Sequence, residues 1–371
     1  MNYRSAVKQV WRHAHPQQLR TDARELVRYA ALAASSHNTQ PWRFDLAPNR
    51  IDLLPDYARR CPAVDPDDHH LFASLGCATE NLVIAGRAAG FESHVVFDAD
   101  KRIVRVAFEG SAPQSSPLFE SIPVRQCTRT EYDGRSLTPD ELRLLENAGA
   151  GRGVDVMLLT SAQQKGEVAE YVAAANSVQF ADAAWATELQ DWIRFSARDA
   201  IRTGDGLYGP VMGSPDVPPW IGKLFMHLAF SASAQNQKDS RNIKSSSAIA
   251  IIHSGRNGAE HWIEAGRCYE RLALQATALN LRTAFINQPV EVAHMRPQFA
   301  QYLGLGERRP DLVVRIGHAP LATKSLRRPL SEVINAQAEK SKIGAPGEIR
   351  TPDHLVRSWS RCSNVQWIGR L

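Results

Sequence analysis

The feature that most constrains this chain is an internal repeat. Residues 76–91, "GCATENLVIAGRAAGF", align without a gap with residues 266–281, "GRCYERLALQATALNL". Glu80 falls opposite Glu270, and apolar residues coincide along both segments. Self-similarity of this kind indicates that one structural unit occurs twice in the chain.

Each copy of the repeat ends in the same local pattern. The two helices are expected to stop at Gly90 and Asn280, residue types that readily adopt left-handed backbone. A strand pattern follows each helix, "SHVVF" in the first copy and "RTAFI" in the second.

Two helices upstream of the repeated segments carry matching start signals. Asp22 is followed three residues later by Glu25, which is the spacing of a capping box. Thr138 is followed in the same way by Glu141, and Pro139 occupies the first helical position. The strand patterns "WRFDL" and "VDVMLL" come next. We therefore predict an α+β fold of two tandem related lobes, each with a small sheet flanked by helices.

The predicted division of the chain follows from these patterns. Lobe 1 covers residues 20–112, after an N-terminal segment of residues 1–19, and lobe 2 covers residues 113–334. Lobe 2 carries a long insert between its first and second strands. There we expect one amphipathic helix at about residues 167–202 and then a Gly/Pro-rich lid at about residues 203–240, since so long a connection is rarely a plain loop.

Residues 335–371 show no helical or strand period. They contain "GEIRTPD", a peptide that resembles read-through into the reverse strand of a transfer-RNA gene. The tail is either a disordered natural extension or a spurious one, and we expect no function from it.

Charge and composition exclude several classes of function. The net charge is +5, but from residue 338 onward six Lys/Arg face three Asp/Glu, so +3 lies in the tail and only +2 in the body. A body so nearly neutral is not expected to bind nucleic acid. No apolar run approaches the ~18 residues of a membrane helix, and no leader is visible, so a cytoplasmic protein is expected. The five cysteines form no C-x-x-C pair, which argues against a disulfide framework and a zinc ribbon.

Two further motifs are better explained by structure than by chemistry. "DPDDHH" at residues 65–70 is interpreted as a helix start with Asp65 as N-cap, and its adjacent histidines are expected on different helix sides, so no metal site is predicted. "GAGRG" at residues 149–153 follows a helix and precedes a strand, the reverse of a dinucleotide loop. Hydrolase and kinase motifs are missing.

Two basic clusters are candidates for binding a phosphate. "VRQCTRTEY" carries Arg125 and Arg129, and "KSLRRPLSEVI" carries Lys324, Arg327 and Arg328. Guanidinium pairs from distant segments can satisfy the oxygens of a phosphate monoester if the fold brings them together.

In these two clusters and in residues 34–44, the chain resembles the FMN-dependent nitroreductases, and among them the two-lobed Acg-type proteins known from mycobacteria. "ASSHNTQPWRF" resembles the Ser, Asn and Gln-Pro-Trp segment that lies against the flavin from the partner subunit. "RQCTRTEY" resembles the Arg-x-Ser-x-Arg segment that holds the FMN phosphate and ribityl chain, with Cys127 at the serine position. "RRPLSEVI" resembles the C-terminal basic motif, in which Arg327 is the better match. The resemblance covers roughly residues 20–334.

The resemblance implies a set of cofactor-binding residues, with one FMN per chain and NAD(P)H as reductant. That set consists of Ser35, Ser36, Asn38, Gln40, Arg125, Cys127, Arg129, Asn287, Lys324, Arg327 and Arg328. Lobe 2 holds the arginine motif and lobe 1 the Q-P-W segment, so one composite site between the lobes is expected, as if the chain mimicked a dimer. A departure from the family lies at "FINQPVEV", where Asn287 and Gln288 replace the usual Glu-Gly pair.

Two functions remain open from the sequence. The first is an oxidoreductase in which hydride passes through flavin N5 to a small electrophilic acceptor, a nitro compound or quinone. The alternative is a flavin-binding module that sequesters or senses FMN without turnover. A monomeric pseudo-dimer and a homodimer are both compatible with the sequence.

Overall fold

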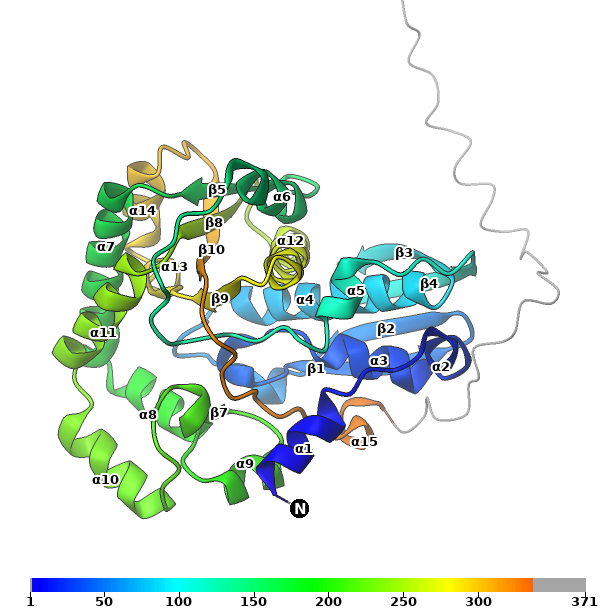
Figure 1. Ribbon diagram of the computed structural model, residues 1–371, viewed down its shortest axis with the longest axis horizontal. Coiled ribbons are helices and arrows are strands. Elements are labelled where there is room, and N and C mark those ends of the chain that lie inside the picture. Colours follow the sequence, from blue (N-terminus) through cyan, green and yellow to red (C-terminus); the bar gives the residue numbers. More distant parts are fainter. Residues whose placement is uncertain (1, 336–371) are drawn as a thin grey trace, which may run out of the picture.

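The computed structural model describes residues 2–335 (Figure 1). The predicted tail, residues 335–371, lies outside the described residues except for Asn335. Among residues 2–335, no helix combines the length and the apolar character that crossing a membrane requires.

Two four-stranded antiparallel sheets carry the two lobes. The first has the order β1-β2-β4-β3 and consists of β1 (Trp42–Ala47), β2 (Arg50–Pro55), β3 (Phe91–Asp98) and β4 (Ile103–Gly110). The second has the order β5-β8-β10-β9 and consists of β5 (Val154–Leu159), β8 (Ala248–Ser254), β9 (Arg282–Phe285) and β10 (Arg309–Gly317). Corresponding strands take corresponding places, so the predicted α+β class with two related lobes is confirmed.

The repeated helices cross between the two sheets (Figure 1). They are α4 (His69–Ala88) and α12 (Ala259–Ala278). A Cβ placed on Gly76 would lie 2.0 Å from the carbonyl oxygen of Ile263, and one on Gly266 would lie 1.9 Å from that of Ala73. Each glycine thus contacts the residue that precedes the other by three. This reciprocity is the signature of a two-fold relation between the lobes.

The helix ends and one of the two predicted capping boxes are confirmed. α6 (Pro139–Gly149) begins with the full Thr138 capping box, and Gly90 and Asn280 end their helices with φ of +86° and +59°. α3 (Ala23–Ala31) begins after Asp22, whose side chain accepts from the amide of Arg24. Its predicted capping box is wrong, because the Glu25 carboxylate is held by Arg12 and Arg28 instead.

The insert of lobe 2 is divided into short elements. They are α7 (Ala162–Ala181), α8 (Ala183–Trp192), β6 (Ile193–Arg194), α9 (Ala197–Thr203), β7 (Leu207–Tyr208), α10 (Pro219–Ala229) and α11 (Ala232–Lys244). The single helix expected at about residues 167–202 is therefore wrong. Asp182 has extended backbone at φ −94° and ψ 111°, and its carboxylate caps α8 through the amide of Ala184.

The C-terminal end of the described chain returns from lobe 2 to the first sheet. Ile334 bridges to Phe44 of β1, and the Asn335 side chain donates to the Asp45 carboxylate at 2.7 Å.

The remaining helices are α1 (Tyr3–Val10), α2 (Pro16–Thr21), α5 (Pro117–Ser121), α13 (Gln288–Glu291), α14 (Arg296–Tyr302) and α15 (Leu330–Val333). One hydrophobic core contains residues of both sheets and of both repeated helices, so the lobes fold against each other.

Candidate functional site

The loop between α3 and β1 is built in a strained conformation. His37, Asn38 and Gln40 have φ of +46°, +54° and +53°. Left-handed backbone costs a residue with a side chain roughly 1–2 kcal/mol, and such strain persists only where surrounding contacts enforce it.

The amide side chains of Asn38 and Gln40 supply those contacts. Gln40 donates from Nε2 to the carbonyl of Gly204 at 2.9 Å and accepts at Oε1 from the amide of Arg328 at 2.8 Å. Asn38 donates from Nδ2 to the carbonyl of Gly206 and accepts at Oδ1 from Arg327 at 3.0 Å. Both amides thus join the loop to the insert and to the C-terminal segment.

Two adjoining cavities lie beside this loop, between the lobes. Their volumes are about 290 Å³ and 50 Å³, and Ser35, Arg129 and Phe285 line both. Ser36, His37 and Asn287 add to the lining of the larger cavity. The smaller cavity is also lined by Asn38, Arg125, Cys127 and Arg327.

The structure therefore brings together eight of the eleven residues expected at one site. Gln40, Lys324 and Arg328 line neither cavity. Gln40 and Arg328 hold the loop in place, and Lys324 donates to the carbonyl of Pro123 and lies over the ring of Trp11, with its Nζ 4.6 Å from the ring centre.

The segment that carries Arg125, Cys127 and Arg129 is positioned by β9, an edge strand of the second sheet. The amide of Thr128 donates to the carbonyl of Thr283 at 2.9 Å, and Cys127 forms a parallel bridge with the same residue. This pairing directs the segment along the side of the sheet that faces lobe 1.

Two of the predicted arginines that line the smaller cavity already have internal partners. Arg125 Nε lies 2.9 Å from a carboxylate oxygen of Glu270, and both side chains are buried. Arg327 Nη2 donates to the carbonyls of Leu32 and Ala33 at 2.9 and 3.0 Å. Glu270, the repeat position opposite Glu80, thus has a role at the site that the sequence did not reveal.

The cations that line the smaller cavity, together with Lys324 behind them, are crowded. Burial, and then the charge of Arg125, lower the pKa of Arg327 to about 9 and that of Lys324 to about 8. Within residues 2–335, Glu270 is the buried carboxylate that pairs with this group of cations, through Arg125. A bound anion would relieve their repulsion.

Arg129 differs from its neighbours. Within residues 2–335 its guanidinium has no hydrogen bond or ion pair with another side chain, yet it lines both cavities. Burial, and then the charge of Arg129, lower the pKa of His37 to about 4. Arg129 is the predicted cation that is available to a ligand.

The far wall of the larger cavity comes from the insert, partly from the region where a lid was expected and partly from residues before it that the sequence analysis did not name. Phe180 lies against Trp185 and Phe230, with ring centres 5.1 and 4.6 Å apart. At the same end, the Nε2 atom of His70 lies 4.0 Å from the Glu291 carboxylate. Apolar and aromatic residues in the insert were the available signal, but they did not specify which of them face inward.

The two adjacent histidines approach different partners. Their rings are 4.5 Å apart, but His69 Nε2 lies 3.4 Å from the Asp311 carboxylate and His70 Nε2 lies 4.0 Å from the Glu291 carboxylate. Asp68, with φ of +62°, takes the N-cap position expected for Asp65.

Asp65, His69 and His70 have ligand atoms within 4.8 Å of one another, the geometry of a possible metal site. However, the two Asp65 oxygens accept from the amides of His70 and Leu71, each at 2.9 Å. The guanidinium of Arg309 also lowers the pKa of His69, after burial and His70, which disfavours a further cation there.

Comparisons with known proteins find similarity to proteins that are named as nitroreductases. No model of a known protein family matches it. It is 26% identical over 330 residues to "Putative NAD(P)H nitroreductase Rv3131" of Mycobacterium tuberculosis, covering 84% of this chain and 90% of that protein. It is 22% identical over 328 residues to "Putative NAD(P)H nitroreductase acg" of the same organism, covering 84% and 95%.

Among solved structures, a nitroreductase with bound FMN from Bacteroides fragilis aligns with a TM-score of 0.36 and 15% identity. The alignment covers 57% of this chain and 96% of the other. Another, NfrA2 of B. megaterium, aligns with a TM-score of 0.36 and 12% identity over 66% and 78%. From the two mycobacterial alignments, the chain is a relative of proteins named as NAD(P)H nitroreductases, and the resemblance to the Acg type that its motifs predicted is confirmed.

Proposed function

We propose that this chain binds one FMN between its lobes and acts as an NAD(P)H-dependent oxidoreductase on a small electrophilic acceptor, such as a nitro compound or a quinone. The observation that carries the proposal is the convergence of Ser35 from lobe 1 with Arg129, Cys127 and Arg327 from lobe 2 on adjoining cavities. The names of the mycobacterial relatives support the same class of activity.

The residues present fit the cofactor. Arg129 and Arg327 would hold the phosphate, because they are cationic and line the smaller cavity. The larger cavity offers Gln288, whose Oε1 is buried without a hydrogen-bond partner, as an acceptor for a polar ligand edge. Together the two cavities reach the lower end of the roughly 300–1,000 Å³ that ligand sites occupy. A flavin would therefore fill them.

When bound, FMN supplies a ring atom, N5, that accepts a hydride and passes it on. Arg129, which lines both cavities, would place a positive charge beside the bound cofactor and would favour negative charge on it. Phe180, Trp185 and Phe230 exclude water from the far side of the larger cavity. His37 stays neutral at physiological pH, since its pKa is about 4, and it contributes no competing charge.

A second candidate function is sequestration of FMN without turnover. It is supported by the insert, because Leu207, Met212, Phe230 and Lys238 all line the larger cavity and so cover it. A nicotinamide must stack within ~3–3.5 Å of the flavin to transfer hydride, which a cover that stays closed would forbid.

Anaerobic addition of NADPH, and separately NADH, to the FMN-loaded protein separates the two functions. An oxidoreductase loses the flavin absorbance near 450 nm within seconds and regains it when a quinone is added. If the flavin stays oxidised while free FMN in a control with a known reductase is bleached, the sequestering module is the correct function. The triple variant Leu207→Ala/Met212→Ala/Phe230→Ala, which shortens three of the side chains that cover the larger cavity, tests whether the cover is responsible: bleaching should then appear.

The proposal of one flavin per chain is tested by its stoichiometry. Denaturation of flavin-saturated protein should release one FMN per polypeptide, measured by absorbance against amino-acid analysis. A ratio near two would contradict the composite single site, whatever the oligomeric state of the chain.

A further inference from the structure

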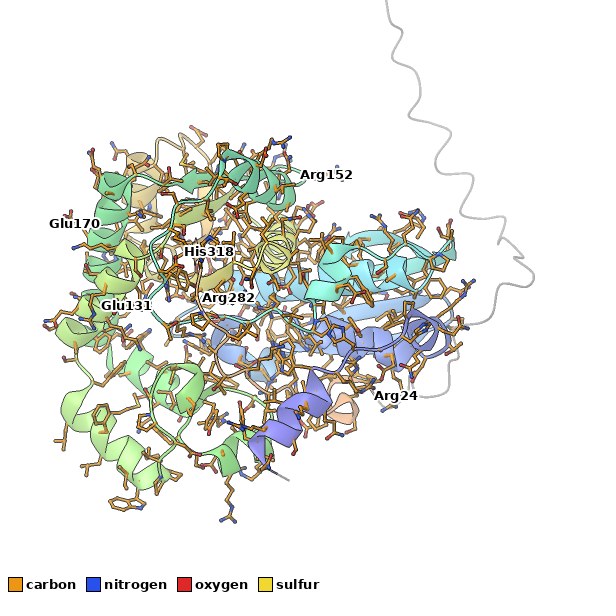
Figure 2. All side chains as sticks on the ribbon, in the orientation of Figure 1. Arg24, Glu131, Arg152, Glu170, Arg282 and His318 are labelled. Atoms are coloured by element: carbon orange, nitrogen blue, oxygen red, sulfur yellow. The ribbon has the colours of Figure 1, made fainter. Side chains whose placement is uncertain are left out.

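Apart from the two adjoining cavities of the candidate site, a further cavity lies between the lobes, on the opposite side of the crossed helices α4 and α12. It is named the second inter-lobe cavity, or second cavity. Its volume is about 490 Å³. Its wall comes from β3 and β4 of the first sheet, from the N-terminal half of α12 and from the loop before β5. Figure 2 shows Arg152 of that loop at the edge of lobe 2 that faces β3 and β4.

This cavity is the two-fold counterpart of the larger cavity at the candidate site. The mutual contacts of Gly76 and Gly266 relate α4 to α12, and the pairing of the strands relates β9 and β10 to β3 and β4. In that relation the α12 residues of the second cavity replace α4 residues of the first: Glu260, Ile263, Glu264 and Arg267 stand, in this order, for His70, Ala73, Ser74 and Cys77. The residues from the sheets correspond in the same way: Val95, Phe97 and Val104 stand for Phe285, Asn287 and Leu312. Its place in the fold is therefore that of a second ligand site.

The exchanged residues make the second cavity unsuitable for FMN. Arg267 stands where the first cavity has the small Cys77, and its guanidinium is bound to Glu80 at 2.8 Å and to Glu264 at 3.1 Å. The first cavity continues into a smaller one with Arg125 and Arg327. Within residues 2–335, the lining of the second cavity includes nothing from the N-terminal segment 2–30 that could supply an equivalent phosphate clamp.

The rim of the second cavity nevertheless carries positive charge without partners. Arg152 and Arg256 are exposed, and in the described part of the chain their guanidinium groups form no hydrogen bond or ion pair. His261 lies beside them and close to Gly153. Of the two acids in the lining, Glu264 is already paired with Arg267, which leaves Glu260 as the opposing charge. The rim is thus net positive, and planar guanidinium groups match the two oxygens of a carboxylate.

The floor of the cavity is apolar. Val95, Phe97 and Val104 of the sheet and Ile263 of α12 provide it. A site with an apolar floor and a few charged groups at its mouth binds a ligand with an apolar body and one charged end.

We propose that the second inter-lobe cavity binds a small organic carboxylate with an aromatic body, distinct from the ligand of the first site. The carboxylate pairs with Arg152 and Arg256, and the ring lies on Val95 and Phe97. This proposal does not depend on the identity of the cofactor, since it rests on the second cavity alone.

Benzoate is the probe, with benzamide as its neutral counterpart. Saturation-transfer NMR and calorimetry on the full chain, with and without excess FMN, should show saturable benzoate binding that FMN does not displace and benzamide binding at least tenfold weaker. The double variant Arg152→Ala/Arg256→Ala should weaken benzoate binding at least tenfold. The matched control Arg4→Ala/Arg198→Ala removes two exposed arginines outside this cavity and should leave binding unchanged.

A second variant, Val95→Trp, fills the floor and should abolish benzoate binding while a melting curve shows that the fold persists. Absence of saturable binding, equal binding by the double variant, or displacement of benzoate by FMN would each overturn the proposal. If FMN itself failed to bind, the proposed function would be lost, but the benzoate measurements would still decide the second site.

Discussion

The crossing of α4 and α12 makes a sharp test of the two-fold relation between the lobes. Gly76→Ala and Gly266→Ala each add one methyl group at the same place in the two copies. The new carbon of Gly76→Ala would lie 2.0 Å from a backbone carbonyl oxygen, and that of Gly266→Ala 1.9 Å from the equivalent one. Carbon–oxygen contacts of this kind are normally about 3.3 Å or longer. The helices must therefore separate by more than about 1 Å.

The magnitude follows from two opposing terms. Alanine is a better helix former than glycine by about 1 kcal/mol, which favours both variants. Overpacking costs about 1–3 kcal/mol, and more where the obstacle is backbone that has no other rotamer. A gap of 0.5–1 Å also forfeits a quarter to a half of the dispersion attraction along the helix contact. We expect each variant to lose about 2 kcal/mol of unfolding free energy, and the double variant to lose less than the sum, because the first separation already admits the second methyl group.

Urea unfolding followed by circular dichroism measures these losses. Gly166→Ala is the matched control, since it is also a helix glycine but a Cβ there would meet nothing within 4 Å. That variant should gain about 0.5–1 kcal/mol. Because the candidate site and the second inter-lobe cavity lie on either side of the crossing of α4 and α12, Gly266→Ala should also weaken flavin retention. Equal or higher stability of Gly76→Ala and Gly266→Ala, or strict additivity in the double variant, would refute the close reciprocal crossing.

Three further outcomes are expected from the candidate site. Arg129→Ala should weaken FMN binding by about 1.5–3 kcal/mol but riboflavin binding much less, whereas Arg135→Ala nearby should change neither, as fluorescence titration would show; equal losses for both ligands would place Arg129 away from the phosphate. Glu270→Gln should cost about 3 kcal/mol of stability in urea, because it leaves Arg125 buried without its counter-charge; an unchanged midpoint would mean that the pair is not ionised. The pKa of Lys324 is about 8 in the free protein, below its unfolded value, so the fold disfavours the charged amine, whereas a bound phosphate favours it. FMN affinity relative to riboflavin should therefore fall as the pH rises through 8; a ratio of the two affinities that stays constant with pH would show that Lys324 is not coupled to the phosphate.

The lobes could be predicted from the sequence because their signals are local. The left-handed ends at Gly90 and Asn280, the Thr138 capping box and the strand patterns each depend on a few neighbouring residues. The gapless repeat then required that these elements occur twice. The insert was harder, since the break at Asp182 is decided by a single side chain that caps the next helix instead of continuing the first.

The sequence predicted which residues to examine at the candidate site, but not the contacts that these residues make. Motif resemblance named Ser35, Arg129 and Arg327, and the fold brings them to adjoining cavities. It could not show that Arg327 and Asn38 are bound to each other, because that contact joins segments almost 290 residues apart. A pattern in sequence identifies a residue type at a position, whereas its free hydrogen-bonding capacity depends on neighbours from the other lobe.

Fusion of two related lobes changes what each site can become. In a symmetric dimer both sites must be identical, because each subunit supplies the same residues to both. Here Glu270 pairs with Arg125 of the segment beside β9, while its counterpart Glu80 pairs with Arg267 of α12 itself. The same repeat position thus supports an arginine at the wall of one site and fixes an arginine inside the other. Such divergence requires two separately encoded copies, and it is what allows the two proposed sites to bind different ligands, FMN in one and a small carboxylate in the other.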